Sequence, residues 1–453
     1  MRALFPKSLF PALMGLLAAC AVASELRFPP PEFETDYTMP GITTPPPRSL
    51  AMEYVDTALL VTALGLAAWL VHRRRSRRGL VALSVFSLVY FGFIRTGCIC
   101  PIGAPQNVAL GMFDPGYTIP LTALAFFLVP LVFSLFWGRT FCAAVCPHGA
   151  LQDLVLIKPV KVPLWIEQGL GIVPFIFLGL GILLAATGTA FIICRYDPFI
   201  PLFRMSGSVF GLTLGGIFLA AALFIGRPFC RFLCPYGALL RLGSIVSRKA
   251  VRITPDHCTQ CRLCEHSCPF GAIREPVKLP VTPNALAPER RRLTWLILAL
   301  PVLIAVGAWL GSKLSVAAAK VHPTVALAEQ FLAGDKAPAP ATALPTPETR
   351  ALGRAAETAP ELIAAASEVR RRLGIGGWWF GGWVGLVIGA RLISLSLRPN
   401  RTDFEPDRGA CYACGRCYLA CPNERVRLGL ITPAEAAALQ AHAPVPRPDA
   451  KPS

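Results

Sequence analysis

Long apolar stretches separated by short polar links dominate the pattern of this chain. After an apolar N-terminal stretch, further stretches recur that are long enough, as helices, to approach the ~30 Å thickness of a bilayer core. We predict seven spans, at residues 55–71, 80–94, 119–137, 170–193, 208–225, 293–311 and 377–397. The pattern therefore predicts an all-α polytopic membrane protein with about seven transmembrane helices.

The N-terminal stretch, residues 1–23, has the plan of a secretory signal, with Arg2 and Lys7 followed by an apolar run and small residues. The residues up to Cys20 resemble a lipoprotein processing site, and Ala21-Val22-Ala23 offers an ordinary cleavage site. An uncleaved anchor helix is the third alternative. In each case we expect residues 24–54 to form a short periplasmic segment.

Basic residues in the links predict the orientation, because short cytoplasmic loops carry an excess of Lys and Arg. The link 72–79 holds five Arg, 138–169 holds three basic residues and 226–292 holds twelve, whereas the links 95–118 and 194–207 hold one and two. We therefore place the first three links in the cytoplasm. Arg370–Arg372 oppose this at the outer end of the last span, but a long loop orients the chain weakly.

This topology divides the rest of the chain into four parts. They are a duplicated transmembrane core (55–225), a cytoplasmic loop (226–292), a transmembrane hairpin (293–397) with a long periplasmic loop (312–376), and a cytoplasmic tail (398–453). The composition agrees, since 54% of residues are hydrophobic and only 15% are charged. An ordinary soluble enzyme is excluded, and the net charge of +18 is explained by topology, so we expect membrane lipid and no nucleic acid as partners.

The core contains an internal repeat. The segment 138–151 (GRTFCAAVCPHGAL) recurs 88 residues later as 226–239 (GRPFCRFLCPYGAL), with nine of fourteen positions identical. Duplicated helical hairpins would bring the two Cys-x3-Cys-Pro motifs to one end of the bundle. Their four thiols could then hold a further metal or iron–sulfur centre or act as a redox-active dithiol, or the motifs could be helix-ending turns with inert thiols. These cysteines are Cys142, Cys146, Cys230 and Cys234.

Two further runs have the spacing Cys-x2-Cys-x2-Cys-x3-Cys-Pro, which is typical of bacterial 4Fe-4S ferredoxins. Zinc is the alternative, but zinc sites rarely use three cysteines at this spacing followed by Cys-Pro. We therefore predict two 4Fe-4S clusters in a cytoplasmic two-cluster ferredoxin-like module. The ligands would be Cys258, Cys261, Cys264, Cys268, Cys411, Cys414, Cys417 and Cys421.

In two-cluster ferredoxins, the fourth cysteine of each run ligates the other cluster. Two membrane crossings separate the runs here and return the chain to the same face. We therefore favour crossed ligation, with Cys421 completing the first set and Cys268 the second, over two self-contained loops.

Three cysteines fall in the predicted outer links: Cys98, Cys100 and Cys194. They could hold a metal or redox site, or they could be structural. Asp114 and Asp197 precede prolines in the same links and fit a turn better than proton transfer. None of the six histidines falls within a predicted span, which excludes a cytochrome b.

Over roughly residues 55–425 the sequence resembles a family of membrane polyferredoxins. The family includes NosR-type accessory proteins of nitrous oxide reduction and NapH-type quinol dehydrogenase subunits of periplasmic nitrate reduction. The likeness rests on the paired Cys-x3-Cys-Pro hairpins, the Cys-x-Cys loop and the two ferredoxin runs. NosR-type proteins also carry a periplasmic domain with FMN bound to an S-G-A-T-like motif, which this chain lacks. We therefore expect FMN only through a partner subunit.

The resemblance implies electron transfer in the bacterial inner membrane. The chain would connect the quinone pool or a cytoplasmic donor with a periplasmic flavoprotein, cytochrome or reductase in nitrous oxide or nitrate respiration. It would be an electron-transfer subunit, with quinol dehydrogenase activity an open question. The alternatives are a metallocentre-assembly factor that reduces copper and a redox-sensing regulator.

Overall fold

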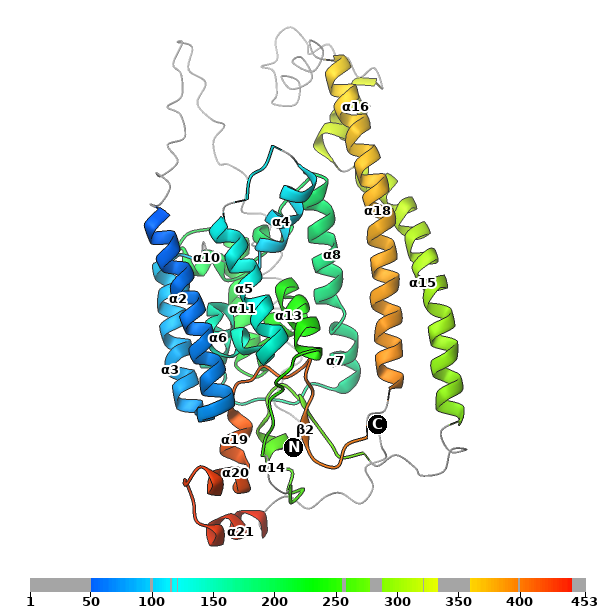
Figure 1. Ribbon diagram of the computed structural model, residues 1–453. Coiled ribbons are helices and arrows are strands. Elements are labelled where there is room, and N and C mark those ends of the chain that lie inside the picture. Colours follow the sequence, from blue (N-terminus) through cyan, green and yellow to red (C-terminus); the bar gives the residue numbers. More distant parts are fainter. Residues whose placement is uncertain are drawn as a thin grey trace, which may run out of the picture.

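The structure is a computed structural model that describes residues 50–97, 101–114, 116–119, 121–254, 258–277, 287–320, 322–332, 359–397 and 400–441. These residues form a helical bundle with one two-stranded sheet (Figure 1). The predicted signal or anchor with Cys20, the segment up to residue 49, and the outer cysteines Cys98 and Cys100 lie outside the described residues.

The first hairpin shows how polar links end the helices. α2 (Leu50–Trp69) runs into a π-helical turn, η1 (Leu70–Arg74), and α3 (Arg77–Ser87) runs into a second one, η2 (Leu88–Ile94). Between them, Arg75 adopts left-handed backbone with φ of 51°. Ser76 then caps α3, because its Oγ accepts a hydrogen bond from the Gly79 amide at 3.2 Å.

The other core helices follow in chain order. They are α4 (Ala104–Phe113), α5 (Leu121–Trp137), η3 (Phe141–Val145), α6 (Pro147–Leu154), α7 (Leu164–Leu170), α8 (Val173–Ala186), α9 (Ile192–Arg195), α10 (Ile200–Phe203), α11 (Val209–Ala222), α12 (Pro228–Phe232) and α13 (Pro235–Ile245).

Five helical stretches of the described residues are long and apolar enough to cross a membrane. They are Ala51–Arg74, Arg77–Ile94, Leu164–Ala186, Pro288–Lys320 and Pro360–Ser396. The predicted spans 119–137 and 208–225 form shorter apolar helices, α5 and α11. The fold is therefore mostly helical with five candidate spans, and a total of seven stays a prediction.

Both copies of the sequence repeat fold as a helix, a short helical turn and a second helix. In each copy the second cysteine has an extended backbone and precedes a proline at the first turn of the next helix, α6 after Cys146 and α13 after Cys234. Proline is favoured there, because the first helical amide needs no partner. The copies differ in the turn, which is π-helical in η3 and α-helical in α12.

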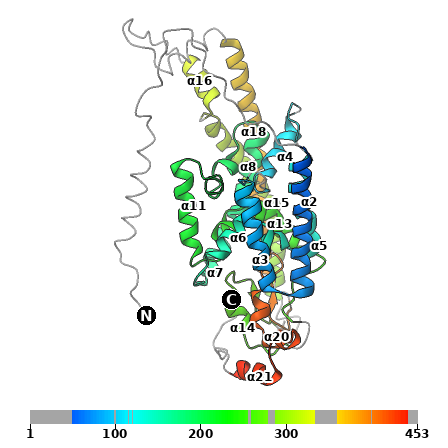
Figure 2. The ribbon, with the colours of Figure 1, turned by 90° about the vertical axis from the view of Figure 1, so that its left-hand side faces the viewer.

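A long helical hairpin, α15 (Ala287–Lys320) and α18 (Ala359–Ser396), lies beside the core (Figures 1 and 2). The two helices pack closely, because a Cβ atom at Gly381 or Gly307 would collide with the backbone of the facing helix. The Trp383 indole donates a hydrogen bond to the Phe175 carbonyl at 2.9 Å and ties the hairpin to α8.

The helices of this hairpin are longer than the predicted spans 293–311 and 377–397, because α15 and α18 continue far into the predicted loop 312–376. α16 (Pro323–Leu332) is also helical there, and Val325 and Ala328 pack against Ala366 of α18. The alanine-rich flanks of that loop favour helix. The membrane boundaries of the two spans stay a prediction.

The two ferredoxin runs meet at one end of the bundle, which we call the ferredoxin end. α14 (Leu263–Ser267) belongs to the first run, whereas α19 (Arg416–Ala420), α20 (Pro422–Arg427) and α21 (Pro433–Ala441) belong to the second run and the chain after it. β1 (Ile273–Arg274) pairs antiparallel with β2 (Glu405–Pro406) and holds the two parts together. α16 lies at the opposite end in both views (Figures 1 and 2).

Candidate iron–sulfur and thiol sites

The first group of thiols combines three cysteines of the first run with one of the second. The thiols that act electrostatically on Cys264 are Cys421, Cys261 and Cys258. Cys421, the residue before α20, in turn interacts with Cys261 and Cys258. We call these four residues the first ferredoxin group.

The second group mirrors the first. Cys417 interacts with Cys411, Cys414 and, from the other run, Cys268. Cys268 also acts on Cys411 and Cys414. We call these four residues the second ferredoxin group. The proximity that crossed ligation requires is therefore present in both groups, although the ligation itself stays a prediction.

Each group offers four sulfur donors, the set that a 4Fe-4S cluster requires. Burial, followed by the nearby Cys421, Cys261 and Cys258 thiolates, raises the pKa of Cys264 to about 12. Burial also raises the pKa of Cys411 to about 12, and Cys414 and Cys268 act in the same direction. Thiolates that oppose one another's ionisation are stabilised by bound cations, so the groups fit iron chemically.

The repeat brings together the four Cys-x3-Cys-Pro cysteines, which we call the inner group. Cys142, Cys146 and Cys230 are each 7% exposed and Cys234 is 6% exposed. Cys234 is influenced by Cys230, Cys146 and Cys142, and Cys230 by Cys142. Burial is the main cause that raises the pKa of Cys230 to about 11.

Two hydrogen bonds orient sulfur atoms of the inner group. The Gln152 side-chain amide donates to Cys230 Sγ at 3.3 Å, and the Gly237 amide donates to Cys234 Sγ at 3.3 Å. In the part of the chain that the structure describes, no three His, Cys, Asp or Glu side chains are grouped to hold a single metal ion, and this applies to the ferredoxin groups as well as to the inner group. The inner group is a buried set of four thiols.

Two arginines cross between the copies of the repeat. Arg227 of the second copy is fully buried and donates hydrogen bonds to the Cys142 and Ala143 carbonyls of the first. A Cβ atom at Gly149 would lie 3.2 Å from Arg227 Nη1, and one at Gly237 would lie 3.3 Å from Arg139 Nη2. Each arginine therefore packs against a glycine of the other copy, and this exchange holds the two halves together.

A buried carboxylate, Asp153, gathers arginines from three parts of the chain. It lies 2.6 Å from Arg77, 3.0 Å from Arg416 of the second ferredoxin run and 3.7 Å from Arg227. Burial opposes its ionisation, but Arg227, Arg77 and Arg416 together lower the pKa of Asp153 to about 2. Arg77 also donates to the Cys414 carbonyl at 2.9 Å, so the network reaches the second ferredoxin group.

Tyr412 connects the second ferredoxin group with the inner group. Its hydroxyl donates to the Cys230 carbonyl at 3.1 Å. The Arg139 guanidinium lies 4.0 Å from the centre of its ring, and the Phe270 ring lies 4.8 Å away. A single side chain next to Cys411 therefore spans the distance between the two groups.

Our sequence analysis missed Arg139, Arg227, Asp153 and Tyr412. A signal for the arginines was present, because Gly-Arg precedes the first cysteine in both copies of the repeat. Asp153 and Tyr412 had no local signal, since their partners come from distant segments.

The described part of the outer links supports turns and close packing, and the link 194–207 reaches His148, two residues after Cys146 of the inner group. Cys194 Sγ lies against the backbone of Gly103, where any side chain would collide with it. The Asp197 carboxylate accepts hydrogen bonds from the Phe199 and Ile200 amides and lies 3.0 Å from His148 Nε2. Asp114 accepts one from the Gly116 amide. The turn role that we favoured for both aspartates is confirmed, and the buried His148 partner was not foreseen.

Two family models match the chain, and both are described as a 4Fe-4S binding domain. One matches residues 119–162 and 208–254, which are the two copies of the repeat, and the other matches residues 251–274, which contain the first ferredoxin run. The chain belongs to the NosR- and NapH-like membrane polyferredoxins. Clustered cysteines and both matches support iron–sulfur clusters in this member of the family.

Three similar proteins illustrate the range of relatives that the chain matches. The uncharacterized protein MJ0750 of Methanocaldococcus jannaschii is 30% identical over 40% of this chain and 77% of its own length. The putative electron transport protein YccM of Escherichia coli is 27% identical over 34% of this chain and 47% of its own length. The regulatory protein NosR of Pseudomonas aeruginosa is 29% identical over 48% of this chain and 32% of its own length.

The chain therefore spans less than half the length of two of these relatives. No solved structure matches it. The relatives support a membrane location and an iron–sulfur electron-transport function in general terms.

Proposed function

We propose that this polyferredoxin passes electrons between the quinone pool or a cytoplasmic donor and a periplasmic redox partner in respiration of the nitrous oxide or nitrate type. The observation that carries the proposal is the arrangement of eight cysteines as two sets of four, each drawn from both ferredoxin runs. The partner would be a flavoprotein, which would supply any FMN, a cytochrome or a reductase.

In this proposal, the first ferredoxin group and the second ferredoxin group each hold one 4Fe-4S cluster. A bound 4Fe-4S cluster supplies reversible one-electron transfer at a potential that its surroundings set. The chain's own residues fix the spacing of the two groups, because Cys264 and Cys417 of different groups also interact with each other. Arg77 and Arg416 bring positive charge to the second group, which favours the reduced, more negative form.

We place the ferredoxin end in the cytoplasm of a bacterial inner membrane, because the basic links lie at that end. The ~30 Å hydrocarbon core is then too thick for one efficient electron hop to a periplasmic acceptor. We propose that Cys194, together with Cys98 and Cys100, supports an outer redox site, with quinone as the alternative carrier.

Analysis of the full chain, purified anaerobically, tests the clusters first. We expect about eight iron atoms and eight acid-labile sulfides from the two ferredoxin groups, and more if the inner group holds a further centre. Stoichiometric zinc with negligible labile sulfide would contradict the proposal.

The route across the membrane is tested separately. The double variant Cys98→Ser/Cys100→Ser should lose electron delivery to the periplasmic partner while both clusters remain intact and reducible. Delivery at the wild-type rate would show that these cysteines are dispensable.

A second candidate function is metallocentre assembly, and the inner group favours it. Four thiols buried away from solvent and close to a redox module could hand over metal as well as electrons. Copper bound by the wild-type protein and lost in Cys142→Ser would support this function over electron transfer alone.

A further inference from the structure

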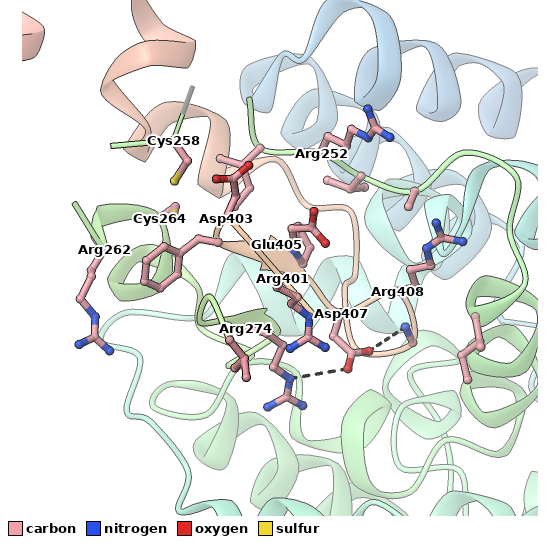
Figure 3. Close-up of a pocket in the computed structure, with 18 of the residues that line it drawn as sticks. Arg252, Cys258, Arg262, Cys264, Arg274, Arg401, Asp403, Glu405, Asp407 and Arg408 are labelled. Carbon is pink, nitrogen blue, oxygen red and sulfur yellow. Dashed lines mark hydrogen bonds and ion pairs between the residues drawn. The ribbon is translucent and has the colours of Figure 1, made fainter. Parts of the chain in front are cut away.

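A large cavity opens at the ferredoxin end beside the first ferredoxin group. Its volume is about 1280 Å³, above the 300–1000 Å³ that is usual for small-molecule pockets. It lies between α7, α13, the end of α18 and the ferredoxin module. Figure 3 shows Cys258 and Cys264 on one side of it, with Arg252 and Arg408 on the other. All four cysteines of the first ferredoxin group line the cavity.

The lining of this cavity is strongly positive. Four carboxylates line it: Glu167, Asp403, Glu405 and Asp407. Eight arginines line it: Arg241, Arg252, Arg262, Arg274, Arg292, Arg391, Arg401 and Arg408. Part of this excess of positive charge can balance the thiolates of the first ferredoxin group. Arg241 and Arg391 are considered separately, because neither forms an ion pair with a described carboxylate.

Arg241 of α13 and Arg391 of α18 both line the cavity, and their like charges repel each other. Burial, followed by Arg391 and Arg139, lowers the pKa of Arg241, so its charge is under-compensated. The nearby carboxylates have other partners, because Glu167 lies 2.9 Å from Arg231 and Asp407 lies 3.6 Å from Arg274. Among the described residues, neither Arg241 nor Arg391 has a carboxylate at ion-pair distance, and the buried Arg391 Nε has no hydrogen-bond partner.

The positive region continues inward. A smaller cavity of about 50 Å³ shares Arg241, Arg274 and Arg391 with the large one. The buried Arg139 also lines it, and Arg139 Nε has no hydrogen-bond partner among the described residues. Glu167 is the one carboxylate that lines this smaller cavity among the described residues, and it is paired with Arg231, so arginine donors outnumber carboxylates here.

The rim of the large cavity is apolar and exposed. Leu164, Ile245, Leu395 and Leu397 all line it and are 42–55% exposed. Leu395 lies at the last turn of α18, where the candidate span Pro360–Ser396 ends. Guanidinium groups behind an apolar rim at the end of a membrane helix match an amphiphile with a phosphate group.

We propose that this cavity binds a phosphate-bearing anion at the membrane surface, with Arg241 and Arg391 as its main ligands. Guanidinium groups suit phosphate because they can donate two parallel hydrogen bonds to it. The phosphate can come from the headgroup of an anionic phospholipid or from free phosphate, and the chemistry of recognition is the same.

The test uses the full chain with its clusters, purified in a neutral detergent and placed in nanodiscs. Binding of phosphatidylglycerol is measured against phosphatidylcholine, and inorganic phosphate is titrated separately. We expect the wild type to prefer phosphatidylglycerol, and Arg241→Gln/Arg391→Gln to bind it roughly thirtyfold more weakly. Arg371→Gln, an exposed arginine far along α18, is the matched control and should bind as the wild type does.

Folding of the double variant is checked by circular dichroism and by its elution in size-exclusion chromatography. If it does not fold, the pair Arg391→Lys and Arg391→Gln replaces it, and the lysine variant should retain more affinity. Lipid binding that inorganic phosphate does not displace identifies the headgroup as the source, and binding of inorganic phosphate alone identifies free phosphate. Equal affinity of wild-type and glutamine variants for both probes would overturn the proposal.

A redox measurement adds a second readout, and only this part rests on the proposed function. An anion in the cavity should shift the midpoint potential of the first ferredoxin group to more negative values, because negative charge disfavours added electrons. The shift should be absent in Arg241→Gln/Arg391→Gln. If no cluster is present, the binding measurement still tests the site.

Discussion

The ferredoxin groups and the inner group bring four cysteines together by different means. In each ferredoxin group, three cysteines come from one short run, and only the fourth comes from a distant segment. In the inner group, two cysteines come from each copy of the repeat, and all four lie within the main hydrophobic core. The ferredoxin groups lie at the end of the bundle, and most of their cysteines are only partly buried, although Cys414 belongs to the edge of the same core.

The spacing of cysteines along the chain is sufficient to assemble most of each ferredoxin group. The inner group forms only when the tertiary fold brings the two copies of the repeat together. A ferredoxin run carries most of its own site in eleven residues, so the bundle only has to supply one partner cysteine. The inner group depends on Arg139 and Arg227 to join the two copies of the repeat. We therefore expect a cysteine substitution in a ferredoxin group to affect the cluster that it ligates, and loss of Arg139 or Arg227 to destabilise the core around the inner group.

The largest effect should come from Cys421→Ser. It removes the thiol that the second run contributes to the first ferredoxin group, so we expect loss of the cluster held by Cys258, Cys261 and Cys264. Iron analysis should give roughly four atoms per chain, and electron paramagnetic resonance of the reduced protein should show which centre is lost. Cys194→Ser, which lies outside both ferredoxin groups, should leave both centres unchanged. Loss confined to the centre of Cys411, Cys414 and Cys417 would show self-contained loops.

Cys142→Ser/Cys230→Ser tests the other side of the comparison. We expect both ferredoxin centres to remain, because neither cysteine belongs to them. A redox titration of the wild type should show one further transition that is missing in the variant. If the two proteins titrate identically, the thiols of the inner group are inert.

Arg227→Met removes a fully buried charge that joins the copies of the repeat. It leaves Asp153 with less compensation and frees the Cys142 and Ala143 carbonyls. Breaking a buried ion pair costs about 3–5 kcal/mol, measured here as the free energy of unfolding in detergent. Arg371→Met, on an exposed arginine, should change stability by less than about 0.5 kcal/mol. A similar small effect for Arg227→Met would contradict a joining role.

Acid should weaken the same network. The pKa of Asp153 is lowered from 3.8 to about 2 in the folded protein, so its contribution is complete above about pH 4. It is lost as the pH falls through about 2, and it amounts to about 2 kcal/mol. Unfolding measured between pH 4 and pH 2 should therefore be less pH-dependent in Asp153→Asn than in the wild type. Parallel curves for the two proteins would rule out this carboxylate as the source.

Tyr412→Phe should have the smallest effect. It removes only the hydrogen bond to the Cys230 carbonyl and keeps the ring against Arg139, so a loss of about 1 kcal/mol is expected. The unfolding temperature should drop slightly, while both ferredoxin centres keep their spectra. Tyr54→Phe, on an exposed tyrosine, serves as the control. A loss of the second centre in Tyr412→Phe would mean that the hydroxyl positions Cys411 as well.

The sequence was informative where the chemistry is local. The spacing of Cys258, Cys261 and Cys264 predicted their group directly, and counting membrane crossings predicted the approach of Cys421. It was less informative about helix lengths and about contacts between distant segments. α15 and α18 continue beyond the predicted spans through alanine-rich flanks that favour helix, which a search for apolar spans does not detect. Asp153 and Tyr412 were missed because their partners are brought to them by the fold.

The exchange of the fourth cysteine also sets an order of events during synthesis. Cys421 is made long after Cys264, and the two helices of a membrane hairpin are made in between. At about 5–20 residues per second, this interval lasts roughly 8–30 s. During that time the nascent chain exposes three thiols without their fourth. Iron delivery that is timed to the finished chain would avoid capture of the wrong metal, whereas early delivery would fill an incomplete site.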